Sequence, residues 1–190
     1  MGRAITSRTT VRHRPPHLYP VALLPLPHPG PFLERLLAEL DELGVEVNGL
    51  HLDHLCYRVG TMERYAQLRN ALSAYGELLA ETTIGGRPIA TFRLHAPIIH
   101  DPWAIHLVEL PAPKPGSPYP EGWEHAEFVV DEGLPSLTQR YPHVNWDLTD
   151  LDKPLNADVR VRLGDFSVKF HRMALDEVIR LEQAGTQGGA

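Results

Sequence analysis

Residues 51–76 read HLDHLCYRVGTMERYAQLRNALSAYG and decide the fold, because they encode a strand that runs directly into a helix. In residues 51–60 apolar side chains alternate with polar ones, which is typical of a strand with two different faces. Thr61 is a suitable N-cap for the helix that follows, and Gly76 supplies a stop signal. This strand and helix begin a unit that continues to residue 111.

Three further strands complete the unit. ELLAETTI precedes Gly85 and Gly86, and RPIATFRL follows them, so the two glycines join two strand-like runs as in a β-hairpin. After a proline-containing loop, AIHLVELP gives the next run. Residues 51–111 therefore predict the order strand, helix, strand, strand, strand.

Residues 122–172 repeat this order. HAEFVV, VNWDL, DVRVRL and FSVKFHR read as strands, and EGLPSLTQRY follows the first of them as a short helical or irregular stretch. Two modules with the same order of elements indicate an internally duplicated domain. We expect an α+β domain over residues 31–186, with one helix at 31–43 before the modules and an amphipathic helix, ALDEVIRLEQ, after them.

Residues 1–30 are a different kind of sequence. They hold four arginines, no acidic residue and a series of prolines. Proline favours extended, polyproline-like backbone over packed elements, so we expect a disordered or loosely draped arm. An arginine-rich, acid-free start also resembles an organelle transit peptide, but the prolines argue against the amphipathic helix that such peptides form.

Composition excludes several classes of protein. Hydrophobic residues make up 43% and charged residues 22% of the 190 residues, as in ordinary globular proteins. The net charge of -6 gives no reason to expect nucleic acid, and no apolar run approaches the roughly 18 to 20 residues that span a bilayer. Cys56 is the only cysteine, which excludes an intrachain disulfide and a cysteine-based zinc or iron–sulfur site. We expect a cytoplasmic protein without nucleic-acid or membrane partners.

The polar faces of the predicted strands collect an unusual set of side chains. Alternation places His54, His125 and His171 on the polar faces of three separate strands, with Glu127 beside His125. A solvated face is the simpler interpretation, because antiparallel sheets often keep one face in water. Solvated strand faces more often carry Thr, Lys, Glu and Ser. Imidazoles and a carboxylate instead suit Zn, Fe, Mn, Ni or Co.

Three stretches carry a resemblance to a known family. GELLAETTIGGRPIATFRLHAPI, IHLVELPAPKPGSPYPEGWEHAEFVV and SVKFHRMALDEVI closely resemble the YecM-like family of small bacterial proteins. That family belongs to the vicinal oxygen chelate superfamily of glyoxalases, extradiol dioxygenases and related proteins. The resemblance runs from about residue 31 to residue 184. It implies duplicated βαβββ modules, near residues 51–111 and 122–172, whose curved and mostly antiparallel sheet forms a cup.

The resemblance also implies a metal site inside this cup. Metal ligands in the superfamily lie on the first and last strands of each module. On this basis His54, Glu109 and His125 are expected to hold one divalent metal ion. Glyoxalase-type members have a glutamate on the final strand, where SVKFHRM offers none, so His171 is the expected fourth ligand and Lys169 the alternative. This departure argues against glyoxalase activity.

Other polar-face residues have candidate roles beside the metal. Glu127 is expected to accept a hydrogen bond from an imidazole or to act as a general base. Arg58, Arg93 and Lys169 would attract a small anionic, oxygenated substrate. Ion pairing of these cations with Glu109 and Glu127 is the alternative.

Two functions remain open at this stage. One is a metal-dependent isomerase, lyase or oxidoreductase, in which the metal acts as a Lewis acid on a small substrate with neighbouring oxygens. The other is a non-catalytic module that binds a small anionic ligand in the cup without a metal ion. The sequence leaves the substrate, the metal's identity and the oligomeric state open.

Overall fold

A computed structural model describes residues 24–116 and 119–187 of the chain. Most of the predicted N-terminal arm, residues 1–23, therefore lies outside the described residues. Within them the chain forms four helices and eight strands. No helix in the described part is long and apolar enough to cross a membrane.

The elements follow the predicted order in both modules. The first module consists of β1 (His51–Arg58), α2 (Met62–Leu72), β2 (Gly76–Ile84), β3 (Arg87–His100) and β4 (Trp103–Pro111). The second consists of β5 (Gly122–Val129), α3 (Leu134–Arg140), β6 (Trp146–Asp147), β7 (Asp158–Leu163) and β8 (Phe166–His171). Helices α1 (Gly30–Glu42) and α4 (Leu175–Gln187) flank them.

All eight strands join one mixed sheet in the order β2-β3-β4-β1-β5-β8-β7-β6. The first strand of each module runs parallel to the last strand of the same module, and the two first strands pair antiparallel at the centre of the sheet. The other described pairs are antiparallel. The sheet is open and pseudo-symmetric about the β1–β5 pair, which confirms the predicted vicinal oxygen chelate fold.

The apolar face of the sheet is covered by three helices. Leucines of α1, α2 and α3 enter one continuous core with the apolar side chains of the strands. Phe92, Phe128 and Phe170, from β3, β5 and β8, are fully buried there. Burying such a side chain contributes about 1.5 to 3 kcal/mol, so this face supplies most of the hydrophobic stabilisation.

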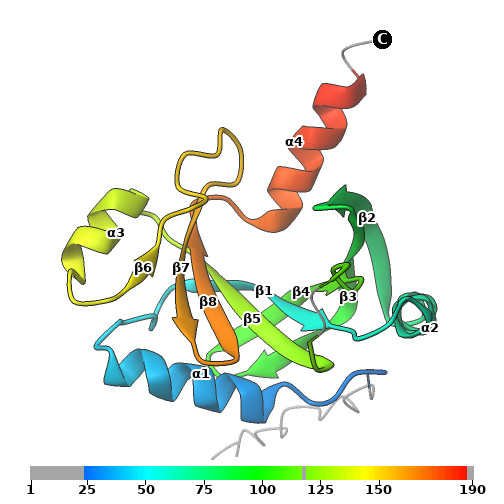
Figure 1. The fold of residues 1–190 in the computed structure, drawn as a ribbon, viewed down its shortest axis with the longest axis horizontal. Helices are drawn as coiled ribbons and strands as arrows, with labels where there is room; N and C mark the ends of the chain where they lie inside the picture. The colour runs from blue at the N-terminus through cyan, green and yellow to red at the C-terminus, as the bar shows by residue number, and fades with distance from the viewer. Residues whose placement is uncertain (1–23, 117–118, 188–190) are drawn as a thin grey trace, which may run out of the picture.

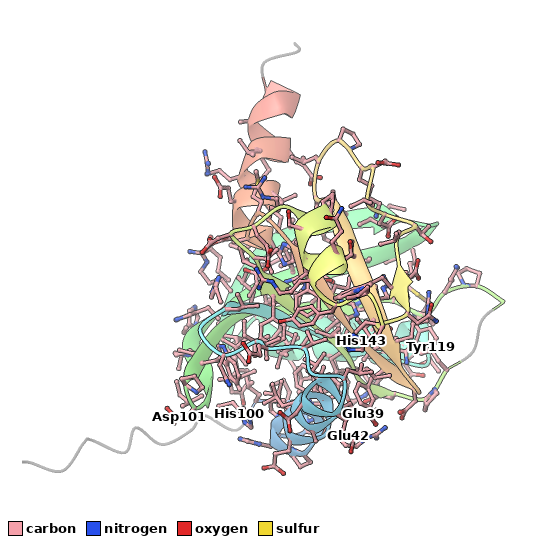
Figure 2. The ribbon with its side chains drawn as sticks, turned by 90° about the vertical axis from the view of Figure 1, so that its left-hand side faces the viewer. Glu39, Glu42, His100, Asp101, Tyr119 and His143 are labelled. Atoms are coloured by element: carbon pink, nitrogen blue, oxygen red, sulfur yellow. The ribbon has the colours of Figure 1, made fainter. Side chains whose placement is uncertain are left out.

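Helix α4 lies on the opposite, polar face. Figures 1 and 2 show α1 on one side of the sheet and α4 on the other. Leu175 and Ile179 of α4 form a small second cluster with Leu107 of β4, next to Leu79 and Ala80 of β2. The polar face is therefore partly covered by one helix.

The described end of the proline-rich segment, residues 24–30, packs against the domain. Leu26 is 7% exposed and belongs to the main core. The indole Nε1 of Trp123 donates a hydrogen bond to the carbonyl oxygen of Pro27, at 3.0 Å. Leucines within this stretch give it apolar surface to bury, which is why these residues are not the loose arm that proline content predicts.

Two predicted elements are shorter than the sequence indicates. Helix α2 stops at Leu72, four residues before the glycine that was expected to end it. Strand β6 keeps two residues of the predicted VNWDL run. There Asp147 Oδ1 accepts hydrogen bonds from the backbone N–H and the hydroxyl of Thr149. This local turn replaces further pairing with β7.

Candidate metal centre

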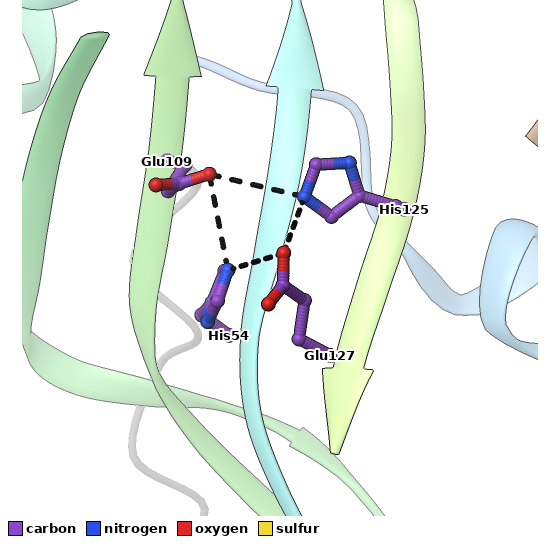
Figure 3. A group of neighbouring side chains, drawn as sticks. All are labelled: His54, Glu109, His125 and Glu127. Atoms are coloured by element: carbon purple, nitrogen blue, oxygen red, sulfur yellow. Dashed lines mark ion pairs between the residues drawn. The ribbon is translucent and has the colours of Figure 1, made fainter. Parts of the chain in front are cut away.

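Three neighbouring strands bring four candidate ligands to the centre of the polar face. His54 comes from β1, Glu109 from β4, and His125 and Glu127 from β5. The strand register explains the grouping, because His54 lies opposite Glu127, while Cys56 lies opposite both His125 and Glu109. Figure 3 shows the four side chains directed toward one another.

The distances within this group suit a metal ion. The Nε2 atom of His54 lies 3.3 Å from Glu127 Oε1 and 3.8 Å from Glu109 Oε2. The Nε2 atom of His125 lies 3.0 Å from Glu127 Oε1 and 3.8 Å from Glu109 Oε2. Ligand atoms about 2.0 to 2.2 Å from one metal ion stand roughly 3 to 3.5 Å apart. One ligand atom from each of the four side chains lies within 4.8 Å of the other three, so the group could hold one metal ion.

The imidazole nitrogens that face the cluster lack hydrogen-bond partners. His54, His125 and His171 are 2%, 6% and 1% exposed, and the Nε2 atom of each is buried without a hydrogen bond. Buried polar atoms in folded proteins are nearly always satisfied, so three such atoms in one place require an explanation. A metal ion at the centre of the cluster would satisfy His54 and His125 at once.

A carboxylate orients each of the two central imidazoles. Asp53 Oδ2 lies 2.8 Å from His54 Nδ1, and Glu124 Oε2 makes a short contact with His125 Nδ1. Each carboxylate can accept a hydrogen bond from the Nδ1–H group, and in the neutral tautomer this places the lone pair on Nε2. This is the usual arrangement around metal-ligating histidines, where the acceptor fixes both tautomer and ring orientation.

Two β-bulges make these pairs possible. Neighbouring residues of a regular strand point to opposite faces. The register between β1 and β5 shifts twice, and Asp53 and Glu124 are the extra residues at the two shifts. A bulge redirects a side chain, so each carboxylate reaches the histidine that follows it. Strict alternation therefore missed Asp53 and Glu124. The available signal was an acidic residue directly before His54 and before His125.

His171 lies beside the four-residue group and not within it. Its Nε2 atom is 3.7 Å from Glu127 Oε2 and 3.6 Å from Asp53 Oδ2. Its Nδ1 atom lies 2.5 Å from the carbonyl oxygen of Met173, to which it donates. Asp53, His54 and His171 form a separate group whose geometry also suits a cation.

Lys169 occupies the position on the last strand that corresponds to Glu109. In the first module Glu109 lies opposite Cys56, and in the second Lys169 lies opposite Glu127. The Lys169 ammonium lies 2.5 Å from Glu127 Oε1. The Lys169 ammonium thus lies at the position where pseudo-symmetry would place a second carboxylate. The second carboxylate of the cluster comes instead from Glu127 on β5.

The structure brings only one of the two candidate arginines to the site. Arg58 Nη1 lies 3.7 Å from Glu124 Oε1, and the guanidinium stacks over the Tyr119 ring at 4.4 Å. Arg93 is directed away, toward α4, where it donates a 2.5 Å hydrogen bond to Asp176. Neither arginine pairs with Glu109 or Glu127 among the described contacts.

The electrostatics of the site favour positive charge between the imidazoles. Burial lowers the pKa of His54, but the carboxylates of Glu127 and Asp53 outweigh it and raise the pKa to about 10. Burial raises the pKa of Glu127, yet the Lys169 ammonium and His54 hold it well below its usual value. Glu127 is therefore ionised, and a proton or a metal ion is stabilised beside it.

An open mixed sheet built from duplicated βαβββ modules, with histidine and glutamate on its central strands, defines a protein of the vicinal oxygen chelate fold. The chain belongs to the YecM protein family, whose model matches residues 30–154. This range includes His54, Glu109, His125 and Glu127, whereas Lys169 and His171 lie beyond it.

Individual relatives agree with this assignment. Protein YecM of Escherichia coli (strain K12) is 33% identical over 177 residues, which cover 80% of this chain and 91% of that protein. An uncharacterized protein of Haemophilus influenzae (strain ATCC 51907 / DSM 11121 / KW20 / Rd) is 31% identical over 99 residues, 51% of each chain. A solved structure titled "Structural Genomics, Protein EC4020" has 31% identity and a TM-score of 0.66, and covers 80% of this chain and 90% of that one.

Proposed function

We propose that this protein binds one divalent metal ion through His54, Glu109 and His125, next to Glu127, and acts on a small oxygenated anion. The observation that carries the proposal is the pair of buried, unpartnered Nε2 atoms of His54 and His125, which face two carboxylates within metal-binding distance. The two Nδ1 atoms are already hydrogen-bonded to carboxylates, so a metal ion that displaces the Nε2 protons would be bound by both Nε2 lone pairs.

The ligand atoms indicate which class of metal ion would bind. Imidazole and carboxylate ligands suit Zn, Fe, Mn, Ni or Co, and two histidines with one carboxylate on one side of the ion leave positions open for substrate. The bound metal would supply Lewis acidity to neighbouring oxygens of that substrate. Isomerase, lyase and oxidoreductase chemistry all use a site of this kind.

The surrounding residues have distinct proposed roles. Glu127 is the proton-transfer group, because Lys169 holds its Oε1 atom while its Oε2 atom faces the Nε2 atom of His171. Lys169 and Arg58 have side chains that are 14% and 21% exposed, so both remain partly accessible beside the candidate ligands and would bind an anionic substituent. Arg93 remains a predicted substrate-binding residue only if its bond to Asp176 opens.

The rival function is a binding module that holds a small anion without any metal ion. Thermal unfolding with added Mn²⁺, Ni²⁺, Zn²⁺ or Fe²⁺ separates the two. An ion that binds only the folded state at 100 times its Kd stabilises it by about 2.7 kcal/mol. For a chain of this size each kcal/mol raises Tm by about 2 to 4 °C.

We expect at least one of these ions to raise Tm by about 5 °C or more in the wild-type protein and to have no such effect on His125→Ala. Equal Tm values with and without all four ions would favour the metal-free module. A cytoplasmic location stays a prediction.

A further inference from the structure

Among its described side chains, helix α4 buries apolar ones only in its first half, and its second half is held by a hydrogen bond from Gln183 Nε2 to the carbonyl oxygen of Leu79 at 3.0 Å. Leu175, Val178 and Ile179 are buried, whereas residues 180–185 are exposed. Figure 1 shows the helix projecting away from the sheet. A cavity of about 400 Å³ lies between α4 and strands β2 and β3, with Leu79, Arg93 and Ile179 in its lining. So small an apolar contact makes α4 a low-stability element of the described structure.

The buried start of α4 is attached to the candidate metal centre through a single carboxylate. Asp53 Oδ2 accepts a hydrogen bond from the backbone N–H of Leu175, at 3.0 Å, and lies 2.8 Å from His54 Nδ1. The Asp53 and His54 side chains are 1% and 2% exposed. The N–H groups at the start of a helix have no partner within the helix, and a negative charge there is stabilising.

We propose that Asp53 is a positioning residue that couples metal binding at His54 to the docking of α4 over the cup. This inference rests on the proposed function. A metal ion on Nε2 of His54 obliges the ring to keep its proton on Nδ1, where Asp53 is the acceptor. The metal polarises the imidazole and strengthens this bond, which fixes the ionised carboxylate in the place where it caps α4.

The coupling works in both directions. A docked α4 holds Asp53 in position and thereby orients His54 for the metal. Linkage requires that metal binding stabilises the docked helix by the same factor by which docking raises metal affinity, and couplings of this kind are typically about 5- to 150-fold. Because α4 lies over Leu107, which is the register neighbour of His54, docking also shields this side of the site from water.

A second attachment of α4 supplies a matched control. Asp176 accepts the 2.5 Å hydrogen bond from Arg93 and is 35% exposed, and it makes no described contact with the candidate ligands. Asp176→Asn weakens α4 docking without touching Asp53. Asp53→Asn keeps the shape of the side chain but removes the charge that strengthens both hydrogen bonds.

Hydrogen–deuterium exchange of the full chain tests the coupling, with Zn²⁺ and Mn²⁺ alone as probes. In the wild-type protein, saturating metal should slow exchange of the α4 amides by about fivefold or more. Asp176→Asn should exchange faster throughout yet keep this metal-induced slowing. Asp53→Asn should lose it at metal concentrations that still saturate the protein, as measured by metal content of the same samples.

Two results would overturn the inference. One is a wild-type protein that binds metal stoichiometrically while α4 exchange stays unchanged, an outcome that leaves the proposed function intact. The other is an Asp53→Asn variant that keeps the full metal-induced slowing. A wild-type protein that binds neither ion would instead refute the proposed function, and the metal analysis distinguishes that case directly.

Discussion

Glu127 and Lys169 form a largely buried ion pair beside the candidate ligands. Their side chains are 4% and 14% exposed, and Nζ lies 2.5 Å from Oε1. Both charges have lost most of their contact with water, so each depends on the other for stabilisation. Removing one partner of such a pair leaves an uncompensated buried charge and typically costs about 3 to 5 kcal/mol.

Glu127→Gln should therefore lower the free energy of unfolding by about 3 kcal/mol, measured by urea denaturation. Arg162→Gln is the matched control, because Arg162 forms a 2.7 Å ion pair with Asp147 but is 67% exposed. Exposed pairs contribute less than about 1 kcal/mol. Equal losses of unfolding free energy in the two variants would show that the buried Glu127–Lys169 pair stabilises the fold no more than an exposed pair does.

Single residues also show what sequence reasoning can and cannot locate. Alternation and family resemblance pointed to His54, Glu109 and His125, and the structure brings these three together. The orienting carboxylates were beyond such reasoning, because Asp53 and Glu124 sit at bulges that break the alternation. Bulges depend on pairing with a distant strand, and local sequence does not reveal that pairing.

At the scale of elements, Gly76 has a different role from the predicted one. It was expected to end a helix, but it begins β2 and pairs with Leu94 of β3. A Cβ atom at this position would lie 2.5 Å from the Arg93 carbonyl oxygen. By contrast, Gly44 has φ 65° just after α1 and does end that helix as predicted. Gly76 thus allows two backbones to approach closely, whereas Gly44 adopts the left-handed conformation that ends a helix.

Gly76→Ala should destabilise the protein by about 1 to 3 kcal/mol, because the backbone of β3 must move to admit the methyl group. Gly60→Ala is the control, since its added Cβ would meet nothing closer than the Tyr119 carbonyl oxygen at 3.7 Å. That control should change the free energy of unfolding by less than about 1 kcal/mol. Chemical denaturation measures the free energy of unfolding of both variants. A Gly76→Ala variant as stable as the Gly60→Ala control would contradict the close approach of β2 to β3.

The pairing of the two modules explains both the overall fold and the position of the candidate site. Pairing β1 with β5 places the first strand of each module at the centre of the sheet, so His54 and His125 meet across the pseudo-symmetry axis. The order of elements was predictable from the sequence because each turn and amphipathic segment leaves a local pattern. The position of α4 on the polar face was not, because its few apolar residues fit either face.

Metal content of the purified protein tests the central claim most directly. Wild-type protein and His125→Ala, prepared without chelator, would be loaded separately with Mn²⁺, Fe²⁺ and Zn²⁺, desalted and assayed for metal per chain. The Nε2 atoms of His54 and His125, with the carboxylate of Glu109, predict one tightly held ion per wild-type chain for at least one of these metals, and its loss in His125→Ala. Absence of bound metal from both proteins, with all three ions, would contradict the account.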